Sequence, residues 1–197
     1  MSGHKRNLYL VGMPGAGKST IGKALARKLT LPFVDADHEM LSHTGVPIST
    51  IFELEGEAGF RTREMQLIHE LCERDGVLLA TGGGAILKEE NRDALRRSGV
   101  VIYLHASLEN LWQRTRHDHR RPLLNTCSPR EALKSLLDAR DALYRRTADI
   151  VVETGRQSVA RLVNELADEL ARRHLWPPGQ LLAVGDDSAN PTSTIAP

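Results

Sequence analysis

The stretch Gly12–Thr20, GMPGAGKST, decides the fold of this chain. It follows a short apolar segment, Leu8–Val11, and precedes apolar residues at helical spacing. Glycines let successive backbone N–H groups turn inward around an anion, and a helix that starts there points its positive end at the same place. The spacing of Gly12, Gly17 and Lys18 fits the phosphate-binding loop pattern. The sequence therefore predicts a strand, a loop that holds a nucleoside triphosphate, and a helix.

The side chains of this loop suit a nucleotide together with Mg²⁺. Lys18 is expected to place its ammonium group near the β- and γ-phosphates, and Ser19 offers a hydroxyl to the metal. The predicted nucleotide-binding residues of the loop are Gly12, Gly15, Ala16, Gly17, Lys18, Ser19 and Thr20. A plain glycine-rich turn is the alternative, but the strand, loop and helix patterns all agree with the motif.

Length and charge predict one domain that acts on small molecules. The chain has 197 residues and a net charge of +1, from 26 basic and 25 acidic side chains. No overall field favours nucleic acid or an anionic membrane, so neither is expected as a partner. The sequence shows neither a signal-peptide core nor an apolar span of about 18 residues, so a cytoplasmic location is expected. Cys72 and Cys127 lack metal-ligand spacing and are expected to be reduced thiols.

Apolar runs that alternate with helical patterns predict an α/β fold. The predicted strands are Leu8–Val11, Phe33–Asp35, Val77–Thr81, Val100–Leu104 and Ile150–Val152. The helical patterns include Ile21–Leu29, Arg63–Glu73 and Leu108–Arg116. This alternation predicts a parallel sheet covered by helices on both faces. A proline-rich composition from Leu175 onward predicts a flexible tail over 175–197, which leaves a single domain over 1–174.

Two carboxylates follow the second predicted strand, where ligands of such sheets bind. Asp35 and Asp37 are two residues apart, and alternation along an extended segment predicts that both lie on one side. One could act on Mg²⁺ through water, while the other accepts a hydrogen bond from a substrate hydroxyl and takes its proton. Two solvated loop acids are the alternative.

Three glycines and three arginines complete the candidate site. Gly82–Gly84 follow the third predicted strand, where many phosphate-loop enzymes carry an aspartate for the metal, and they leave room for a small polar substrate. Arg61, Arg121 and Arg140 could each grip a carboxylate or a phosphate with two N–H groups. For any one of them alone, a solvated surface arginine is the alternative.

Together these motifs resemble the shikimate kinases, small phosphate-loop enzymes akin to the nucleoside monophosphate kinases. The resemblance covers about residues 7 to 170 and rests on GMPGAGKST, Asp35-Ala36-Asp37, Ile51-Phe52-Glu53, Gly56-Glu57, Phe60-Arg61, Gly82-Gly83-Gly84, Arg121-Pro122-Leu123-Leu124, Arg140 and Leu143-Tyr144-Arg145. It implies a three-layer phosphate-loop kinase fold with a five-stranded parallel sheet, a substrate-binding segment at about 36–64 and a lid at about 110–129. The implied reaction transfers the γ-phosphoryl group of ATP to the 3-hydroxyl of shikimate, in chorismate and aromatic amino acid biosynthesis.

The resemblance also implies roles for particular residues. Asp37 would bind the reacting hydroxyl, and Arg61 and Arg140 would hold the ring carboxylate of shikimate beside Gly82, Gly83 and Gly84. Arg121 would be the lid arginine that reaches the transferring phosphate, which makes Asp37, Lys18 and Arg121 the implied catalytic residues.

The remaining implied roles concern the nucleotide and its metal. Arg114 would stack near adenine, and Asp35 would act on one Mg²⁺ through water, beside Ser19. Arg156 lies in the stretch Glu153–Arg156, which matches the family's adenine-contacting segment only loosely. We expect the chain to be a monomer.

Three other functions stay open on the sequence. A nucleotide switch would need the Asn-Lys-x-Asp guanine reader of phosphate-loop GTPases, which this chain lacks. Another small-molecule kinase, acting on gluconate or a nucleoside monophosphate, would also need arginines, but the combined DxD, GGG and RPLL motifs argue against it. A nucleotide-binding paralogue without catalysis is the third.

Overall fold

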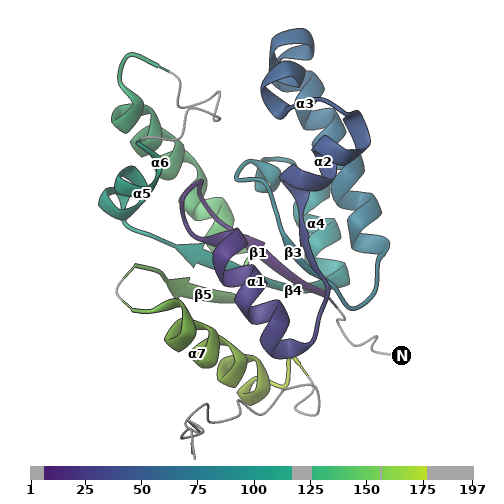
Figure 1. Cartoon of the computed structure of the whole chain (residues 1–197), viewed down its shortest axis with the longest axis vertical. Coiled ribbons are helices and arrows are strands. Elements are labelled where there is room, and N and C mark those ends of the chain that lie inside the picture. The colour runs from purple at the N-terminus through teal and green to yellow at the C-terminus, as the bar shows by residue number, and fades with distance from the viewer. Residues whose placement is uncertain (1–6, 117–125, 156, 177–197) are drawn as a thin grey trace, which may run out of the picture.

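The computed structural model describes residues 7–116, 126–155 and 157–176. Five parallel strands form one sheet in the order β2-β3-β1-β4-β5 (Figure 1). The strands are β1 (Asn7–Val11), β2 (Phe33–Asp35), β3 (Leu78–Ala80), β4 (Gly99–His105) and β5 (Ile150–Glu153). The predicted α/β fold with a parallel sheet is confirmed, and every predicted strand is present with its ends within about one residue.

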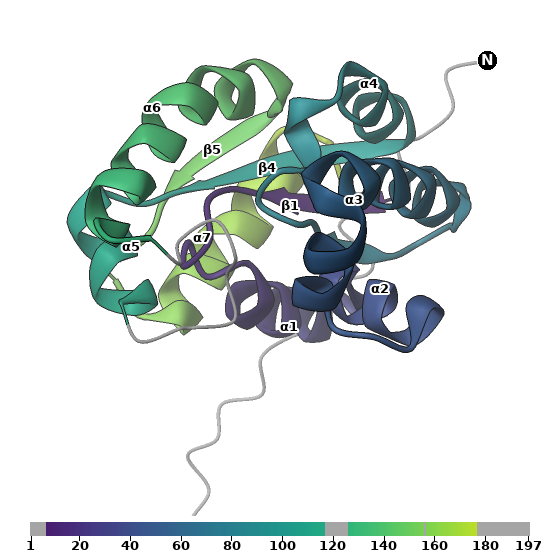
Figure 2. The ribbon, with the colours of Figure 1, turned by 90° about the horizontal axis from the view of Figure 1, so that it is seen from above.

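Helices cover both faces of this sheet. They are α1 (Lys18–Leu29), α2 (Ala36–Thr44), α3 (Ile48–Glu73), α4 (Glu89–Ser98), α5 (Leu108–Thr115), α6 (Pro129–Thr147) and α7 (Val159–Arg172), with a short 3₁₀ turn η1 (Ala85–Leu87). Figure 2 shows α4 and α6 on one side of the sheet and α1 on the other, where α7 packs beside α1. Two of the predicted helical patterns lie within α1 and α3, and the third, Leu108–Arg116, extends one residue beyond α5.

The core lies on both faces of the central strand β1 and of its neighbour β4. All five residues of β1 are buried, and β4 is buried over its first six residues. Leu8 pairs with Leu78 on one side and with Val100 on the other. A strand covered by helices on both faces must be apolar throughout, which is why these segments read as continuous apolar runs.

The segment after β2 is helical from its first residue. Asp35 is the N-cap of α2, and its Oδ1 accepts a hydrogen bond at 3.1 Å from the backbone N–H of Asp37. The prediction that the segment from Asp35 to Asp37 is extended is therefore wrong, although both residues line the same cavity. An aspartate that satisfies an unpaired N–H of the first turn favours helix over continued strand.

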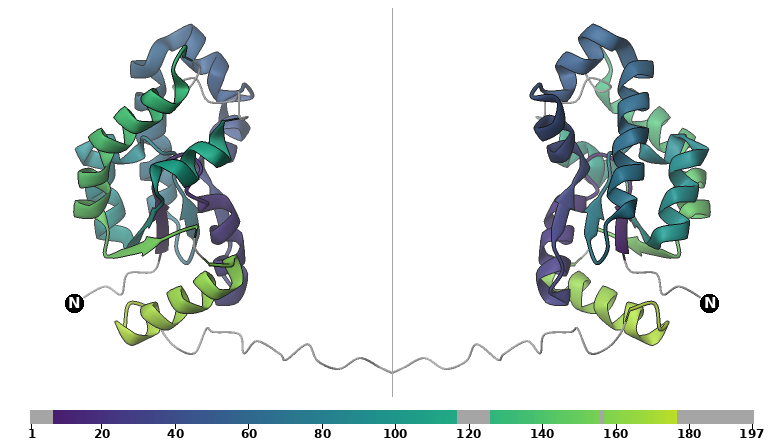
Figure 3. Two further views of the ribbon diagram at one scale, coloured as in Figure 1. Left: turned by 90° about the vertical axis from the view of Figure 1, so that its left-hand side faces the viewer. Right: turned by 90° about the vertical axis from the view of Figure 1, so that its right-hand side faces the viewer.

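Helix α3 is bent at Gly56, whose φ of 68° and ψ of −177° interrupt the helix. In Figures 1 and 3 the helix extends past the sheet, at the end of the molecule opposite α7. Two hydrogen bonds cross the bend, from Arg63 Nε and Nη2 to the Glu55 carboxylate, at 2.8 and 2.6 Å. Arg61 follows the bend on the same helix, so the bend helps to set where Arg61 lies.

The described chain ends in two apolar residues that pack against the core. Trp176 is 5% exposed, and Leu175 donates its backbone N–H to the Leu170 carbonyl at 3.0 Å. The prediction that Leu175 and Trp176 belong to a flexible tail is therefore wrong, because these side chains bury apolar area at the end of α7. Residues 177–197 lie outside the described part of the chain.

Candidate functional site

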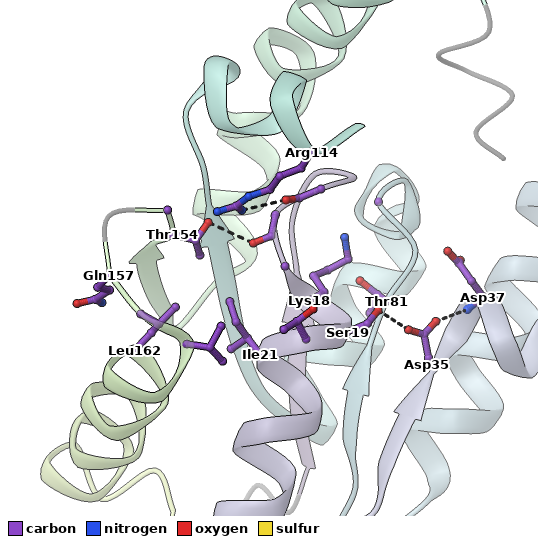
Figure 4. A pocket seen from close by; sticks show the side chains of 17 residues that line it. Lys18, Ser19, Ile21, Asp35, Asp37, Thr81, Arg114, Thr154, Gln157 and Leu162 are labelled. Carbon is purple, nitrogen blue, oxygen red and sulfur yellow. Dashed lines mark hydrogen bonds between the residues drawn. The ribbon is translucent and has the colours of Figure 1, made fainter. Parts of the chain in front are cut away.

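The carboxyl ends of the strands border an open cavity of about 430 Å³. Figure 4 shows Lys18 and Ser19 between Asp35 and Asp37 on one side and Arg114 and Thr154 on the other. The cavity is lined by Gly15, Ala16, Gly17, Lys18, Ser19, Thr20, Ile21, Asp35, Asp37, Thr81, Gly83, Arg114, Thr154, Gly155, Gln157, Val159 and Leu162. The structure thus brings the phosphate-binding loop, both aspartates and one glycine of the triplet to one place.

The phosphate-binding loop folds around its own lysine. Lys18 Nζ donates to the carbonyls of Gly12 at 2.8 Å and Met13 at 3.1 Å. Gly12, with φ of 146°, approaches β4 so closely that a Cβ there would lie 2.6 Å from the Leu104 carbonyl oxygen. The ammonium group therefore lies inside the loop, in a position that suits a bound polyphosphate.

Two side chains from outside the loop bind its next carbonyls. Arg114 Nη1 donates to the Gly15 carbonyl at 3.1 Å, and Thr154 Oγ1 donates to the Ala16 carbonyl at 3.2 Å. Carbonyl oxygens that are bonded to these donors are turned away from an anion, so the loop can present N–H groups to it. α5 and the end of β5 therefore help to set the loop conformation.

A hydroxyl and a carboxylate meet at the start of α1. Ser19 Oγ donates to Asp35 Oδ2 at 2.6 Å, and both residues line the cavity. The described residues contain no group of three or more His, Cys, Asp or Glu side chains that could hold a metal by themselves. Mg²⁺ prefers one or two protein oxygens plus water and phosphate oxygens, and Ser19 with Asp35 fits this donor set.

Arg61 is a buried cation with two carboxylate partners. Its guanidinium contacts Glu64 at 2.6 Å and Glu57 at 3.0 Å, all three residues on α3. Burial acts to lower the pKa of Arg61, but the two carboxylates outweigh burial and raise it. Burial also raises the pKa of Glu64, although the Arg61 guanidinium opposes this shift. Arg61 therefore stays charged inside the protein.

The glycine triplet is the meeting point of the acidic and basic side chains. A Cβ at Gly84 would overlap the Arg61 guanidinium, and one at Gly82 would lie 2.5 Å from Glu64 Oε1 and 3.4 Å from Asp37 Oδ1. The close approach of these side chains explains why glycine occupies both positions. We name the region around Gly82–Gly84 the triplet site.

Arg140 reaches the same triplet from α6. It is 4% exposed, and its Nη1 donates to the Gly83 carbonyl at 3.3 Å. Two buried guanidinium groups, Arg61 and Arg140, thus lie near one buried carboxylate, Glu64. The carboxylates of Glu57 and Asp37 also lie nearby, so the arginines suit an anionic group through their guanidinium N–H groups and not through an excess of positive charge.

The structure brings together most of the predicted site residues, and two others lie outside the described part of the chain. Arg121 and Arg156 lie outside the described residues, so their roles stay predictions, as does the lid to which Arg121 was assigned. Arg114 is exposed and borders the nucleotide side of the cavity.

Two residues of the site are absent from the sequence-based set. Glu64 could have been found as a carboxylate three residues after Arg61 on one helix face. Thr154 carries no local signal, because its contact with Ala16 spans 138 residues.

Known proteins with similar sequences are shikimate kinases. The family profile described as shikimate kinase matches residues 14–171. The shikimate kinase of Cupriavidus pinatubonensis is 54% identical over 83% of this chain and 85% of its own length. That of Pseudomonas syringae pv. tomato is 55% identical over 84% of this chain and 96% of its own length.

A solved structure agrees with these sequence matches. Shikimate kinase from Acinetobacter baumannii, in complex with shikimate, superposes with a TM-score of 0.84 at 44% identity, over 87% of this chain and 96% of that one. Among the described residues, no helix is long and apolar enough to cross a membrane.

The family profile, the similar sequences and the solved structure all agree. They show that the chain belongs to the shikimate kinase family of ATP-dependent kinases.

Proposed function

We propose that this chain transfers the γ-phosphoryl group of ATP to the 3-hydroxyl of shikimate, with the acceptor bound at the triplet site. The observation that carries the proposal is the approach of Asp37, Arg61 and Arg140 to the same three glycines. The two arginines would bind the ring carboxylate, since buried guanidinium groups form strong, charge-assisted hydrogen bonds with carboxylates.

Asp37 would orient the reacting hydroxyl and accept its proton. Asp37 lines the cavity together with Lys18, and a Cβ at Gly82 would lie 3.4 Å from its Oδ1. As the acceptor oxygen forms its bond to the γ-phosphorus, the hydroxyl proton would pass to Asp37, and the bond from the γ-phosphorus to the bridging oxygen would break to release ADP. A carboxylate in this position provides general base catalysis.

Lys18 and Arg121 would stabilise the charge of the transferring group. Phosphoryl transfer depends mainly on positioning and on cations around the equatorial oxygens. Ser19 and, through water, Asp35 would hold one Mg²⁺, which supplies charge neutralisation at the β- and γ-phosphates. Arg114 and Arg156 would contact the adenine end of ATP.

Substitution of the two acceptor arginines by lysine tests this assignment. Arg61→Lys and Arg140→Lys keep the charge but lose the planar fork, so we expect the KM for shikimate to rise by about 10-fold or more while the KM for ATP changes little. Arg96→Lys is the control, because Arg96 is an exposed arginine in the last turn of α4. An equal rise in both KM values would contradict the assignment.

We also propose that the enzyme works as a monomer in the cytoplasm, without nucleic acid or membrane partners. The nearly balanced charge of the chain supports this proposal. Size-exclusion chromatography with light scattering, at several protein concentrations, tests the monomeric state. A stable dimer mass would contradict it.

A further inference from the structure

Tyr144 is a fully buried phenol next to the acceptor arginines, and no step above uses it. It lies on α6, one turn after Arg140. Its hydroxyl donates to the Gly83 carbonyl at 2.5 Å. Burial raises the pKa of Tyr144 far above the ordinary value, so the hydroxyl keeps its proton and stays a donor.

The Gly83 carbonyl is shared between Tyr144 and Arg140. Arg140 Nη1 lies 3.3 Å from the same oxygen, well beyond the distance from Tyr144. A guanidinium group has five N–H donors. Because Tyr144 supplies the shorter bond to Gly83, Arg140 can direct its stronger hydrogen bonds elsewhere.

The ring of Tyr144 is held from the neighbouring strand. It stacks on Tyr103 of β4, with ring centroids 4.7 Å apart and planes at 18°. The Tyr103 hydroxyl donates to Asp141 Oδ1 at 2.9 Å, and Asp141 also accepts from Arg145 Nε at 2.7 Å. These contacts hold the ring of Tyr144 against β4. The Tyr144 hydroxyl, by contrast, donates a hydrogen bond to the triplet site.

We propose that Tyr144 is a positioning residue for the acceptor: its hydroxyl holds the Gly83 carbonyl, so that the glycine triplet keeps its place and Arg140 faces the acceptor carboxylate. The proposal rests on the acceptor site proposed above and adds to it a residue that acts through Gly83 and Arg140. Loss of the hydroxyl would leave the half-buried Gly83 carbonyl to Arg140 alone, and the guanidinium would turn toward Gly83 and away from the acceptor.

Tyr144→Phe tests this role, with Tyr103→Phe as the matched control. Both changes remove one hydroxyl and leave the stacked rings in place, but only Tyr144 contacts Gly83. We expect Tyr144→Phe to raise the KM for shikimate about 10-fold, with the KM for ATP and kcat within about twofold of the wild type. Tyr103→Phe should leave both KM values within about twofold. Equal effects of the two variants on the KM for shikimate would overturn the proposal.

The melting temperatures of both variants separate a role in the site from a role in the fold. We expect similar shifts, since each variant loses one hydrogen bond from the same aromatic pair. Failure of Tyr144→Phe to fold, with Tyr103→Phe folded, would contradict the proposal, because the hydroxyl would then serve the fold.

A double-mutant cycle with Arg140→Lys tests whether Tyr144 acts through Arg140. In the Arg140→Lys background we expect Tyr144→Phe to change the KM for shikimate less than about threefold, because the group that Tyr144 positions is already altered. An undiminished effect would overturn the proposal. Wild-type enzyme that transfers no phosphate to shikimate would instead overturn the proposed function, which keeps the two failures distinct.

Discussion

Asp37 donates its backbone N–H to the side chain of Asp35, which fixes its place in the first turn of α2. Asp37→Asn keeps the size of the side chain and removes its basic character. We expect kcat to fall by about 10²–10⁴-fold while ATP binding is unchanged, because only the partner of the acceptor hydroxyl is altered. Steady-state kinetics and calorimetric titration with ATP measure the two effects.

The neighbouring His38 provides the control for Asp37. It is exposed and lies in the same turn of α2, so His38→Ala should leave kcat within about twofold, as for a surface substitution. If Asp37→Asn retained more than about a tenth of the wild-type kcat, the assignment of Asp37 as the base would be wrong.

Glu64 makes the stability of the protein depend on pH. Its pKa is raised by burial in the folded state, so folding favours its neutral form. The stabilisation relative to Glu64→Gln is then complete below the unfolded pKa, about 4.3, and is lost as pH rises through the higher folded pKa. We expect the free energy of unfolding of the wild type, relative to Glu64→Gln, to decrease over this range.

Urea denaturation between pH 4 and pH 8 would measure this difference. Glu57→Gln is the matched control, because it also removes a partner of Arg61 but from the exposed side of the guanidinium. If the free energy of unfolding of the wild type, relative to Glu64→Gln, increased with pH, the charge of Arg61 would outweigh burial. The predicted direction of the pH dependence would then be wrong.

The bend of α3 depends on a backbone conformation that only glycine adopts easily. At Gly56, φ of 68° with ψ of −177° lies in a region nearly closed to other residues, whereas Gly45, at the end of α2, has φ of 71° and ψ of 0°. A Cβ would meet no atom within 4 Å at either position, so any cost comes from the backbone alone. The two glycines therefore form a matched pair.

We expect Gly56→Ala to lower the free energy of unfolding by about 1–3 kcal/mol. Gly45→Ala should lower it by about 1 kcal/mol, because the left-handed region is less costly for alanine. The bend precedes Arg61 on the same helix, so Gly56→Ala should also raise the KM for shikimate, and Gly45→Ala should not. Chemical denaturation measures the free energy of unfolding, and steady-state kinetics measure the KM for shikimate. A greater loss of stability in Gly45→Ala than in Gly56→Ala would contradict the explanation from backbone strain.

Across the whole chain, apolar runs and motif spacing predicted the sheet and the phosphate-binding loop. They did not predict contacts between residues far apart in the sequence. Gly12–Thr20 carries its own spacing and lies between a strand and a helix, so its structure follows from neighbouring residues. The contact of Thr154 with Ala16 and the pairing of Arg140 with Gly83 depend on the packed sheet.

Two errors of the sequence reading have local physical causes. The segment after β2 was expected to stay extended, but the Asp35 cap starts a helix there. Leu175 and Trp176 were assigned to the tail because prolines and glycine follow them, although their own apolar area favours burial. In both cases one or two side chains determined the local structure, and the pattern of the surrounding segment did not indicate their effect.

Dependence of ADP release on the acceptor tests the central claim most directly. Purified protein with Mg²⁺ and ATP would be assayed with shikimate, gluconate, AMP, CMP or no acceptor, by coupled detection of ADP. We predict release with shikimate alone. The two buried arginines and Asp37 suit a hydroxylated carboxylate, and membership of the shikimate kinase family favours shikimate over gluconate. Equal release with another acceptor, or with none, would contradict the account and remove the acceptor roles of Arg61 and Arg140.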